Sequence, residues 1–313
     1  MTDAAWETLS NQAVAAAGVV YFLALLAHLV EWAGLRGVSA EEEVSTGRTA
    51  MFGRLGVLLT VVAAVAHTVA LVGRGMAADP NRVPWGNMYE FALSGTFFLV
   101  LIYLLLFRRF RLQWMGPVVT GLSVAIIMTA VIWLYKPVAP LTEALESPWL
   151  VIHVVSAVIA TGAFTLGGIA SLLYLLKERS TSTTGYLARV PDLKVLDRIS
   201  YRIHAFAFPV WTFAVLITGP IWAHEAWSRY WNWDPKEVWA FITWVVYAAY
   251  LHARTTAGWK GRNSCYIALV GVVTLWFSFI GVNYFSSTSQ HSYAEGAALH
   301  QVVERAVPEP VRL

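Results

Sequence analysis

The chain has 313 residues, of which 58% are hydrophobic and 13% are charged. Soluble domains carry roughly 25% charged residues, so this composition excludes an ordinary soluble protein and favours a membrane protein. The formal net charge is only +3, and Lys and Arg in membrane proteins mostly mark the cytoplasmic loops, so we infer no nucleic-acid binding. Cys265 is the only cysteine, which excludes an internal disulfide and a two-thiol redox cycle within this chain.

Eight mostly apolar runs are long enough to cross a membrane core about 30 Å thick. They lie at residues 14–33, 52–73, 90–107, 115–134, 150–176, 205–225, 236–254 and 265–284. The N-terminus carries Asp3 and Glu7 where a cleaved signal peptide has a basic region, so we expect the first run to stay as a membrane helix. The longest internal connection, 177–204, is polar, basic and too short for a soluble domain. The expected fold is all-α and polytopic, one integral membrane domain over residues 1–313.

Basic residues divide unevenly between the two sets of connections. The odd-numbered connections hold 14 Lys and Arg residues, whereas the even-numbered connections and the C-terminal tail hold 6. The excess of Lys and Arg marks the cytoplasmic side, so the odd connections are expected there. Both termini, the Trp-rich connection between the sixth and seventh runs and the short tail over 285–313 are then extracytoplasmic.

Seven tryptophans gather around that Trp-rich connection: Trp211, Trp222, Trp227, Trp231, Trp233, Trp239 and Trp244. The residues from Asp234 to Glu237 read Asp-Pro-Lys-Glu, a strong helix start with Asp as N-cap, Pro at the first helical position and Glu closing a capping box. This cap explains Asp234, Pro235 and Glu237 as structural residues, but it does not explain the density of rings before it. Trp at a membrane interface is common, and rigid flat rings also suit a platform for a large planar ligand.

Two of the eight histidines lie at the level of these rings. His153 begins the fifth run and His291 follows the eighth, so both are expected on the outer side. A ring platform with a histidine on either side in sequence is what a haem needs when its iron takes two axial imidazoles.

Other histidines lie deeper. By helical rise, His252 is about 25 Å into the seventh run and His28 about 20 Å into the first. Because a polar group in lipid is costly, an intramembrane His is a functional hypothesis by default, and this applies to His252, His28 and His67. We interpret the remaining three as hydrogen-bonded surface residues: His204, His224 and His300.

Residues 227–239 resemble the WWD signature of haem-handling membrane proteins, which the CcmC and CcmF relatives of System I share. The fuller context resembles the CcsA (ResC) family of System II cytochrome c biogenesis, often labelled CcsB in bacteria. The further matches cover most of residues 55–295: Pro84-Trp85-Gly86-Asn87-Met88-Tyr89-Glu90, Ser147-Pro148-Trp149-Leu150-Val151-Ile152-His153, Tyr250-Leu251-His252-Ala253-Arg254 and His291-Ser292-Tyr293-Ala294. Ser228 stands where the signature usually has Gly, which predicts crowding in a tight turn.

The resemblance implies a haem-binding loop over about 222–239 and a role for haem b. It implies that His153 and His291 are the axial ligands of an external haem and that His252 ligates haem on its way across the membrane. The signature residues implied at the haem are Trp227, Trp231, Trp233 and Asp234. The implied partners are a ResB-type membrane protein, apocytochrome c and a thioredoxin-like protein that keeps the thiols reduced.

The implied activity is that of a cytochrome c synthase component, a haem lyase acting with its ResB-type partner to join haem to the Cys-x-x-Cys-His segment of apocytochrome c. No catalytic acid, base or nucleophile is evident, so we expect catalysis by positioning. The expected location is the plasma membrane, or a thylakoid-type membrane in a phototroph, with the active face outside. Three alternatives remain open at this point: a haem exporter without synthase activity, a b-type electron-transfer cytochrome and a transporter that binds no haem.

Overall fold

The computed structural model describes residues 1–38, 47–140 and 145–286, and these parts are helical and contain no strand. The α-helices are α1 (Asp3–Gly34), α2 (Gly47–Met76), α3 (Met88–Phe110), α4 (Gly116–Thr129), α5 (Pro148–Glu178), α6 (Gly185–Arg189), α7 (Leu193–Thr212), α8 (Gly219–Trp227), α9 (Pro235–Thr255), α10 (Arg262–Trp276) and α11 (Val282–Phe285). A 3₁₀ segment, η1 (Leu112–Met115), precedes α4. Three π-helical segments continue α4, α7 and α10: η2 (Ala130–Leu134), η4 (Phe213–Thr218) and η5 (Phe277–Gly281).

Seven of the helical segments are long and apolar enough to span a membrane, which confirms the expected polytopic, all-α fold. They are Asp3–Gly34, Gly47–Met76, Met88–Phe110, Leu112–Leu134, Pro148–Glu178, Leu193–Trp227 and Arg262–Phe285. The eighth expected run, 236–254, also forms a helix, α9. It falls outside the apolar set because Trp, Tyr and charged side chains interrupt its aliphatic residues. At 21 residues, α9 is about 31 Å long, which matches a membrane core of about 30 Å.

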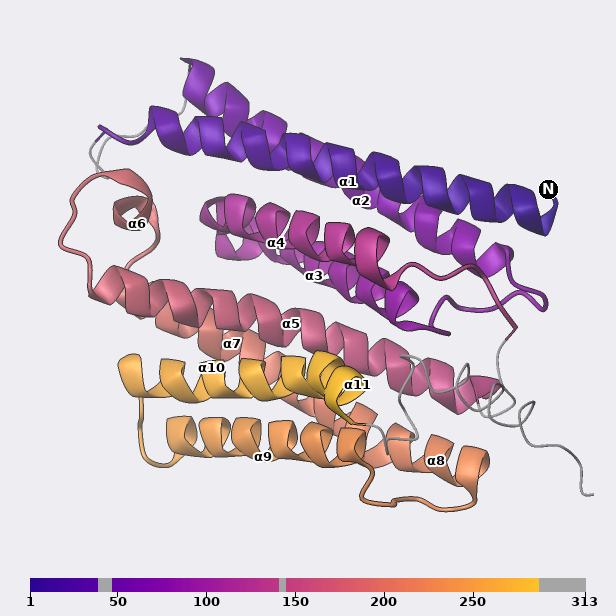
Figure 1. Ribbon diagram of the computed structural model, residues 1–313. Coiled ribbons are helices and arrows are strands. Elements are labelled where there is room, and N and C mark those ends of the chain that lie inside the picture. Colours follow the sequence, from indigo (N-terminus) through magenta and orange to yellow (C-terminus); the bar gives the residue numbers. More distant parts are fainter. Residues whose placement is uncertain (39–46, 141–144, 287–313) are drawn as a thin grey trace, which may run out of the picture.

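The long helices run side by side, so the described connections collect at two ends of the bundle (Figure 1). One end holds the N-terminus and the connections from α2 to α3 and from α8 to α9; His153 lies there, in the second turn of α5. We name this the His153 end. The opposite end holds the connections from α3 to α4 and from α9 to α10, and we name it the His252 end because His252 lies in the last turn of α9. The side of the membrane that each end faces stays a prediction.

Small side chains allow the first two helices to approach closely. Ala13, Ala17 and Ala24 of α1 are buried, as are Ala63 and Ala70 of α2. Close backbone approach through small residues is a common way for membrane helices to associate. Large apolar side chains point away from the bundle instead, among them Val19, Leu58, Val65, Leu105 and Val273. This surface suits contact with lipid.

A buried ion-pair cluster fixes the start of α3 at the His153 end. The Glu90 carboxylate accepts from Arg74 Nε at 2.9 Å, from Arg82 Nη1 at 2.8 Å and from the Gly86 backbone N–H at 2.7 Å. Arg74 and Glu90 are both fully buried. Removing one partner of a buried ion pair leaves an uncompensated charge, which is strongly destabilising. The cluster therefore holds α2, α3 and their connection in one arrangement, and with them one wall of the cavity described next.

Candidate functional site

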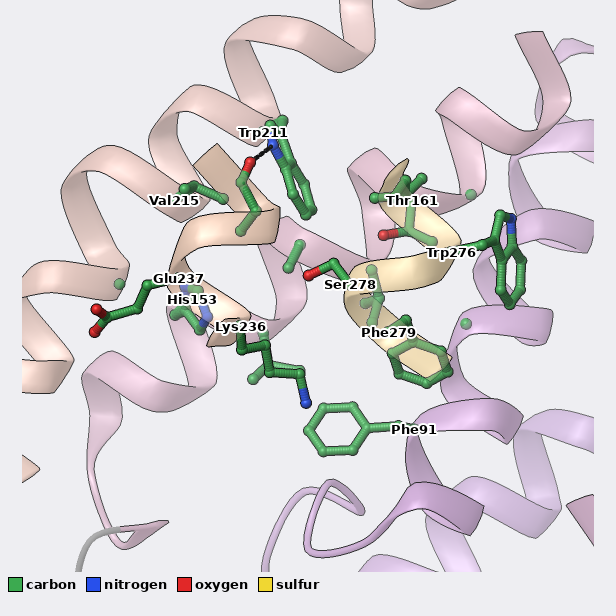
Figure 2. A pocket seen from close by; sticks show the side chains of 18 of the residues that line it. Phe91, His153, Thr161, Trp211, Val215, Lys236, Glu237, Trp276, Ser278 and Phe279 are labelled. Carbon is green, nitrogen blue, oxygen red and sulfur yellow. Dashed lines mark hydrogen bonds between the residues drawn. The ribbon is translucent and has the colours of Figure 1, made fainter. Parts of the chain in front are cut away.

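A cavity of about 190 Å³ lies at the His153 end, between α3, α5, α8, α9 and η5. Its walls are mostly apolar and aromatic, with contributions from Phe91, Leu99, Leu150, Val154, Val158, Trp211, Val215, Trp222, Tyr230, Trp231, Leu275, Trp276 and Phe279. Polar groups are few and include His153, Thr161, Lys236 and Ser278, all visible in Figure 2. A largely apolar cavity with a few placed polar groups is the usual form of a small-molecule or cofactor site.

His153 has its ring orientation and tautomer fixed by the backbone. Its Nδ1 lies 2.9 Å from the carbonyl oxygen of Ala214, and because a carbonyl only accepts, Nδ1 carries the proton. In a neutral imidazole the lone pair is then on Nε2. The ring also stacks on the indole of Trp222, with centroids 5.9 Å apart and planes 12° apart. Metal-binding histidines are oriented in this way, by a hydrogen bond from the nitrogen that does not bind the metal.

The Ala214 carbonyl belongs to the π-helical segment η4. It accepts from the Gly219 N–H, five residues on, and from Thr218 Oγ1 at 3.1 Å, besides His153. A Cβ at Gly219 would lie 3.0 Å from the Ala214 oxygen and 3.2 Å from His153 Cε1. A side chain at this position would therefore crowd both partners of the hydrogen bond, and Gly219 leaves room for the His153 ring beside this carbonyl. Short π-helical segments within α-helices frequently occur at functional sites.

The three signature tryptophans occupy different positions. Trp231 lines the cavity. Trp227, the last residue of α8, packs edge-on against the wall residue Trp222, with centroids 4.9 Å apart. Trp233 is 72% exposed and its ring is at 89° to that of Trp231. The structure therefore does not arrange these rings as one flat platform. Of the three, only Trp231 lines the cavity and can contact a ligand there directly.

Two residues of the connection from α8 to α9 adopt the left-handed backbone region. Ser228, the C-cap of α8, has φ of 57°, and Trp233 also has φ of 57°. The first is the position where the signature usually has Gly, so the left-handed turn explains that preference. A left-handed conformation is uncommon for a residue other than Gly and unfavourable for a bulky one. Strain of this kind is concentrated at functional sites.

The predicted helix cap before α9 is confirmed. Asp234, 4% exposed, accepts from the Lys236 N–H at 2.9 Å. The Glu237 carboxylate reaches back to the N–H groups of Asp234 and Asn232, at 3.1 and 2.9 Å. This capping box joins the tryptophan-containing loop to α9 and sets where the Lys236 side chain leaves the helix.

Among the described residues, the predicted ligand His252 and its possible partner His28 do not line the cavity. His291 lies outside the described residues. His252 is exposed at the opposite end of the bundle, with its Nδ1 3.5 Å from Thr256 Oγ1. His28 is 1% exposed, and a Cβ at Gly56 or Gly116 would meet its ring. Because α1 and α9 lie on opposite sides of the bundle (Figure 1), the structure does not bring His28 and His252 together.

The interpretation of His204 as a surface residue is wrong. His204 is fully buried in α7, and its Nδ1 lies 2.7 Å from the Ser200 carbonyl oxygen. Its ring packs near Phe164, Tyr247 and Tyr250. His224 is exposed, as expected, and stacks on Tyr230, whereas His300 lies outside the described residues. His67 is fully buried between Tyr21 and Phe97.

Several parts of the cavity reach His153 only through tertiary structure and were not predicted from the sequence. The wall residue Phe91, the Ala214 carbonyl and Gly219 carry no recognisable local signal. Lys236 did carry one, since a charged side chain at the start of an apolar run in a membrane protein calls for an explanation. The helix cap explains Asp234, Pro235 and Glu237 but not the side chain of Lys236.

The sequence matches the family described as Cytochrome C assembly protein over residues 85–289. Among curated relatives, the Cytochrome c biogenesis protein CcsA of Guillardia theta is 34% identical, covering 75% of this chain and 83% of the relative. The CcsA proteins of Porphyra purpurea and Synechococcus sp. (strain JA-2-3B'a(2-13)) are 31% and 29% identical; the matches cover 86% and 94% of this chain and 93% and 96% of those relatives.

A solved structure, that of the Cytochrome c Heme Lyase CcmF, superposes with a TM-score of 0.63 at 18% identity. The match covers 90% of this chain and 49% of that one, so the chain spans about half the length of that structure. At this level of identity the similarity shows a shared fold.

Proposed function

Because this chain belongs to the CcsA family of cytochrome c biogenesis proteins, we propose that it binds haem b in the cavity at the His153 end and promotes its covalent attachment to apocytochrome c. The observation that carries this proposal is His153, whose Nδ1 is held by the Ala214 carbonyl in an apolar, aromatic cavity. That tautomer presents Nε2, the nitrogen needed to ligate iron.

Haem is the substrate in this proposal, with His153 as one axial ligand of its iron and His291 as the other. The apolar walls exclude water, and Trp231 contacts the flat face or edge of the ring system. Each thiol of a Cys-x-x-Cys-His segment adds across one vinyl group, so that sulfur bonds to one vinyl carbon and hydrogen to the other. The histidine of that segment then replaces a protein ligand on the iron, and the product leaves.

Positioning accounts for the rate enhancement. Effective molarities of oriented groups reach about 10⁵–10⁸ M, so a fixed haem beside bound thiols needs little further assistance from acid or base groups. The chain has a single cysteine, buried Cys265. Reduction of the apocytochrome thiols therefore falls to a separate, thioredoxin-like protein.

His252 serves an earlier step in this proposal. It is exposed at the opposite end of the bundle from the cavity, where it is accessible to a second membrane protein. We assign it as a ligand that receives haem together with a histidine of a ResB-type partner. The His153 end then faces the extracytoplasmic side of a plasma or thylakoid-type membrane, as the distribution of Lys and Arg predicts.

The proposal is tested by co-expressing the chain with a reporter apocytochrome, with and without a ResB-type partner, and staining denatured gels for covalently held haem. Covalent haem on the reporter only when both membrane proteins are present supports a synthase. Haem that reaches the extracytoplasmic side without any thioether product indicates an exporter. Haem that stays with the chain through repeated product formation indicates an electron-transfer cytochrome.

A further inference from the structure

Lys236 is the cation that lines the cavity. Among the described lining residues only Lys236 and Glu237 are charged, and the Glu237 carboxylate accepts two backbone N–H groups of the preceding loop. Figure 2 shows the Lys236 side chain leaving the start of α9 and extending past His153 toward the Phe91 ring of α3. A cationic side chain is therefore placed at the same cavity as the imidazole.

The apolar surroundings of Lys236 strengthen the electrostatic effect of its charge. The cavity walls are mostly apolar, and charges interact more strongly in such surroundings than in water because the local dielectric constant is lower. The Lys236 side chain is half-buried. The Asp234 carboxylate interacts with this ammonium group electrostatically, and the ammonium group also attracts a ligand that carries an anionic group at a matching distance from the part that His153 binds.

Axial ligation alone leaves one degree of freedom undetermined. An imidazole fixes the iron and the plane of a porphyrin, but the ring can still rotate about the iron–nitrogen bond. Attachment to two particular cysteines requires that each vinyl group occupy a defined position, so a contact away from this axis is needed. The two propionates of haem are its anionic groups, and they lie at fixed positions relative to its vinyl groups.

We propose that Lys236 binds a propionate carboxylate of the haem and thereby fixes the rotation of the ring about the axis set by His153. This inference rests on the proposed function and adds a positioning residue to it. The capping box supports the role, since Asp234 and Glu237 fix the first turn of α9 from which Lys236 extends. The Trp-rich loop and the propionate contact are then parts of one rigid unit.

The test uses the full chain, purified without haem and titrated while the Soret band is followed. Three porphyrins are compared: haem, haem dimethyl ester, in which both propionates are blocked, and mesohaem, which keeps the propionates but has ethyl groups for vinyls. The variants are Lys236→Met and Lys236→Arg. Arg229→Met is the matched control, because Arg229 is an exposed cation of the same loop that does not line the cavity.

We expect the unchanged protein to bind haem and mesohaem roughly 10- to 100-fold more tightly than the dimethyl ester, the range typical of a hydrogen bond to a charged group. Lys236→Met should lose this preference through weaker haem binding, with the ester unaffected. Lys236→Arg should keep most of it, and Arg229→Met all of it.

Equal binding of haem and its ester by the unchanged protein overturns the inference, as does a Lys236→Met variant that keeps the full preference. A variant that loses affinity for all three porphyrins equally shows a structural role only and also overturns it. The proposed function fails separately, if the unchanged protein binds none of the three.

Discussion

His153 and His204 share one local arrangement and differ in their surroundings. Each has its Nδ1 within hydrogen-bonding distance of a backbone carbonyl oxygen, Ala214 at 2.9 Å and Ser200 at 2.7 Å. His153 lines a cavity, whereas His204 is fully buried and its Nε2 has no hydrogen-bond partner among the described residues.

An oriented imidazole is therefore not enough to make a ligand site. A Cβ at Gly167 would lie only 2.6 Å from His204 Cε1, so α5 already fills the space beside that ring. At His153 the neighbouring helices diverge enough to leave a cavity, and η4 turns a carbonyl toward the ring. A ligand site needs the orientation and the space together, so of these two histidines we expect His153 to bind haem and His204 not to.

Replacing His252 by Ala should have the largest effect on haem reaching the cavity in cells. His252 is exposed at the far end from His153, so its loss should stop delivery without changing the cavity. At limiting haem supply the variant should carry a small fraction of the wild-type haem, yet purified protein should bind added haem with unchanged affinity. Normal loading in cells would contradict the delivery role.

The His28→Ala variant is the control for the partner of His252. Because His28 is buried against Gly56 and Gly116, we expect reduced protein stability and no comparable loss of loading. A loss equal to that of His252→Ala would instead indicate an internal pair of histidines.

Substituting Gly219 by Ala should weaken haem binding several-fold. The added methyl group would lie 3.0 Å from the Ala214 oxygen and 3.2 Å from His153 Cε1, so the ring must shift.

Gly167→Ala should displace His204 instead and lower stability by about 1–3 kcal/mol without changing the haem spectrum. Gly121→Ala, whose Cβ would meet Leu25 at an ordinary 3.6 Å, is the control for both. Identical haem affinities for all three variants would refute the link between Gly219 and His153.

Changes of the signature tryptophans should have intermediate effects that depend on position. Trp231 lines the cavity and Trp233 is 72% exposed. An aromatic contact contributes about 0.5–1.5 kcal/mol, so Trp231→Ala should weaken haem binding by roughly two- to tenfold. Trp231→Phe and Trp233→Ala should each cost less, and Trp227→Ala should act through Trp222 and hence through the His153 ring. The measurement is the haem dissociation constant, and a larger effect at Trp233 than at Trp231 would count against this assignment.

Asp234→Asn should have the smallest effect, because Asn also caps helices. Asp234→Ala should lower thermal stability, by about 1 kcal/mol, since it removes the acceptor for the Lys236 N–H. Abolished haem binding in an Asp234→Asn protein that still folds and inserts would show a chemical role for this carboxylate.

Local sequence signals predicted the long helices and the residue at which α9 begins, whereas the first and sixth apolar runs are only the inner parts of longer helices. Asp234, Pro235 and Glu237 form the predicted capping box, because a cap depends on residues within one turn. The apolar runs form helices because backbone groups in lipid must bond within their own segment. Ser228, at a position where the signature usually has Gly, also indicated a tight turn, because the left-handed turn there depends on three or four consecutive residues.

Packing between distant segments could not be predicted in the same way. His204 was expected at the surface, but its burial depends on α5 and α9, which contribute Phe164 and Tyr247 around its ring. The arrangement of Trp231 and Trp233 at right angles depends on how the loop turns in space. The hydrogen bond from His153 to Ala214 joins residues 61 positions apart. Ala214 belongs to a π-helical segment, which no local sequence pattern predicted.

The visible spectrum of the purified protein and of its His153→Gly and His204→Gln variants, each with and without free imidazole, tests whether His153 ligates the haem iron. The unchanged protein and His204→Gln should show low-spin haem with two imidazole ligands. His153→Gly should show little haem or an altered spectrum, and imidazole, by filling the vacated position, should restore ligation. An unaltered spectrum in His153→Gly, or the loss of haem in a folded His204→Gln protein, would contradict the assignment of His153 as the ligand.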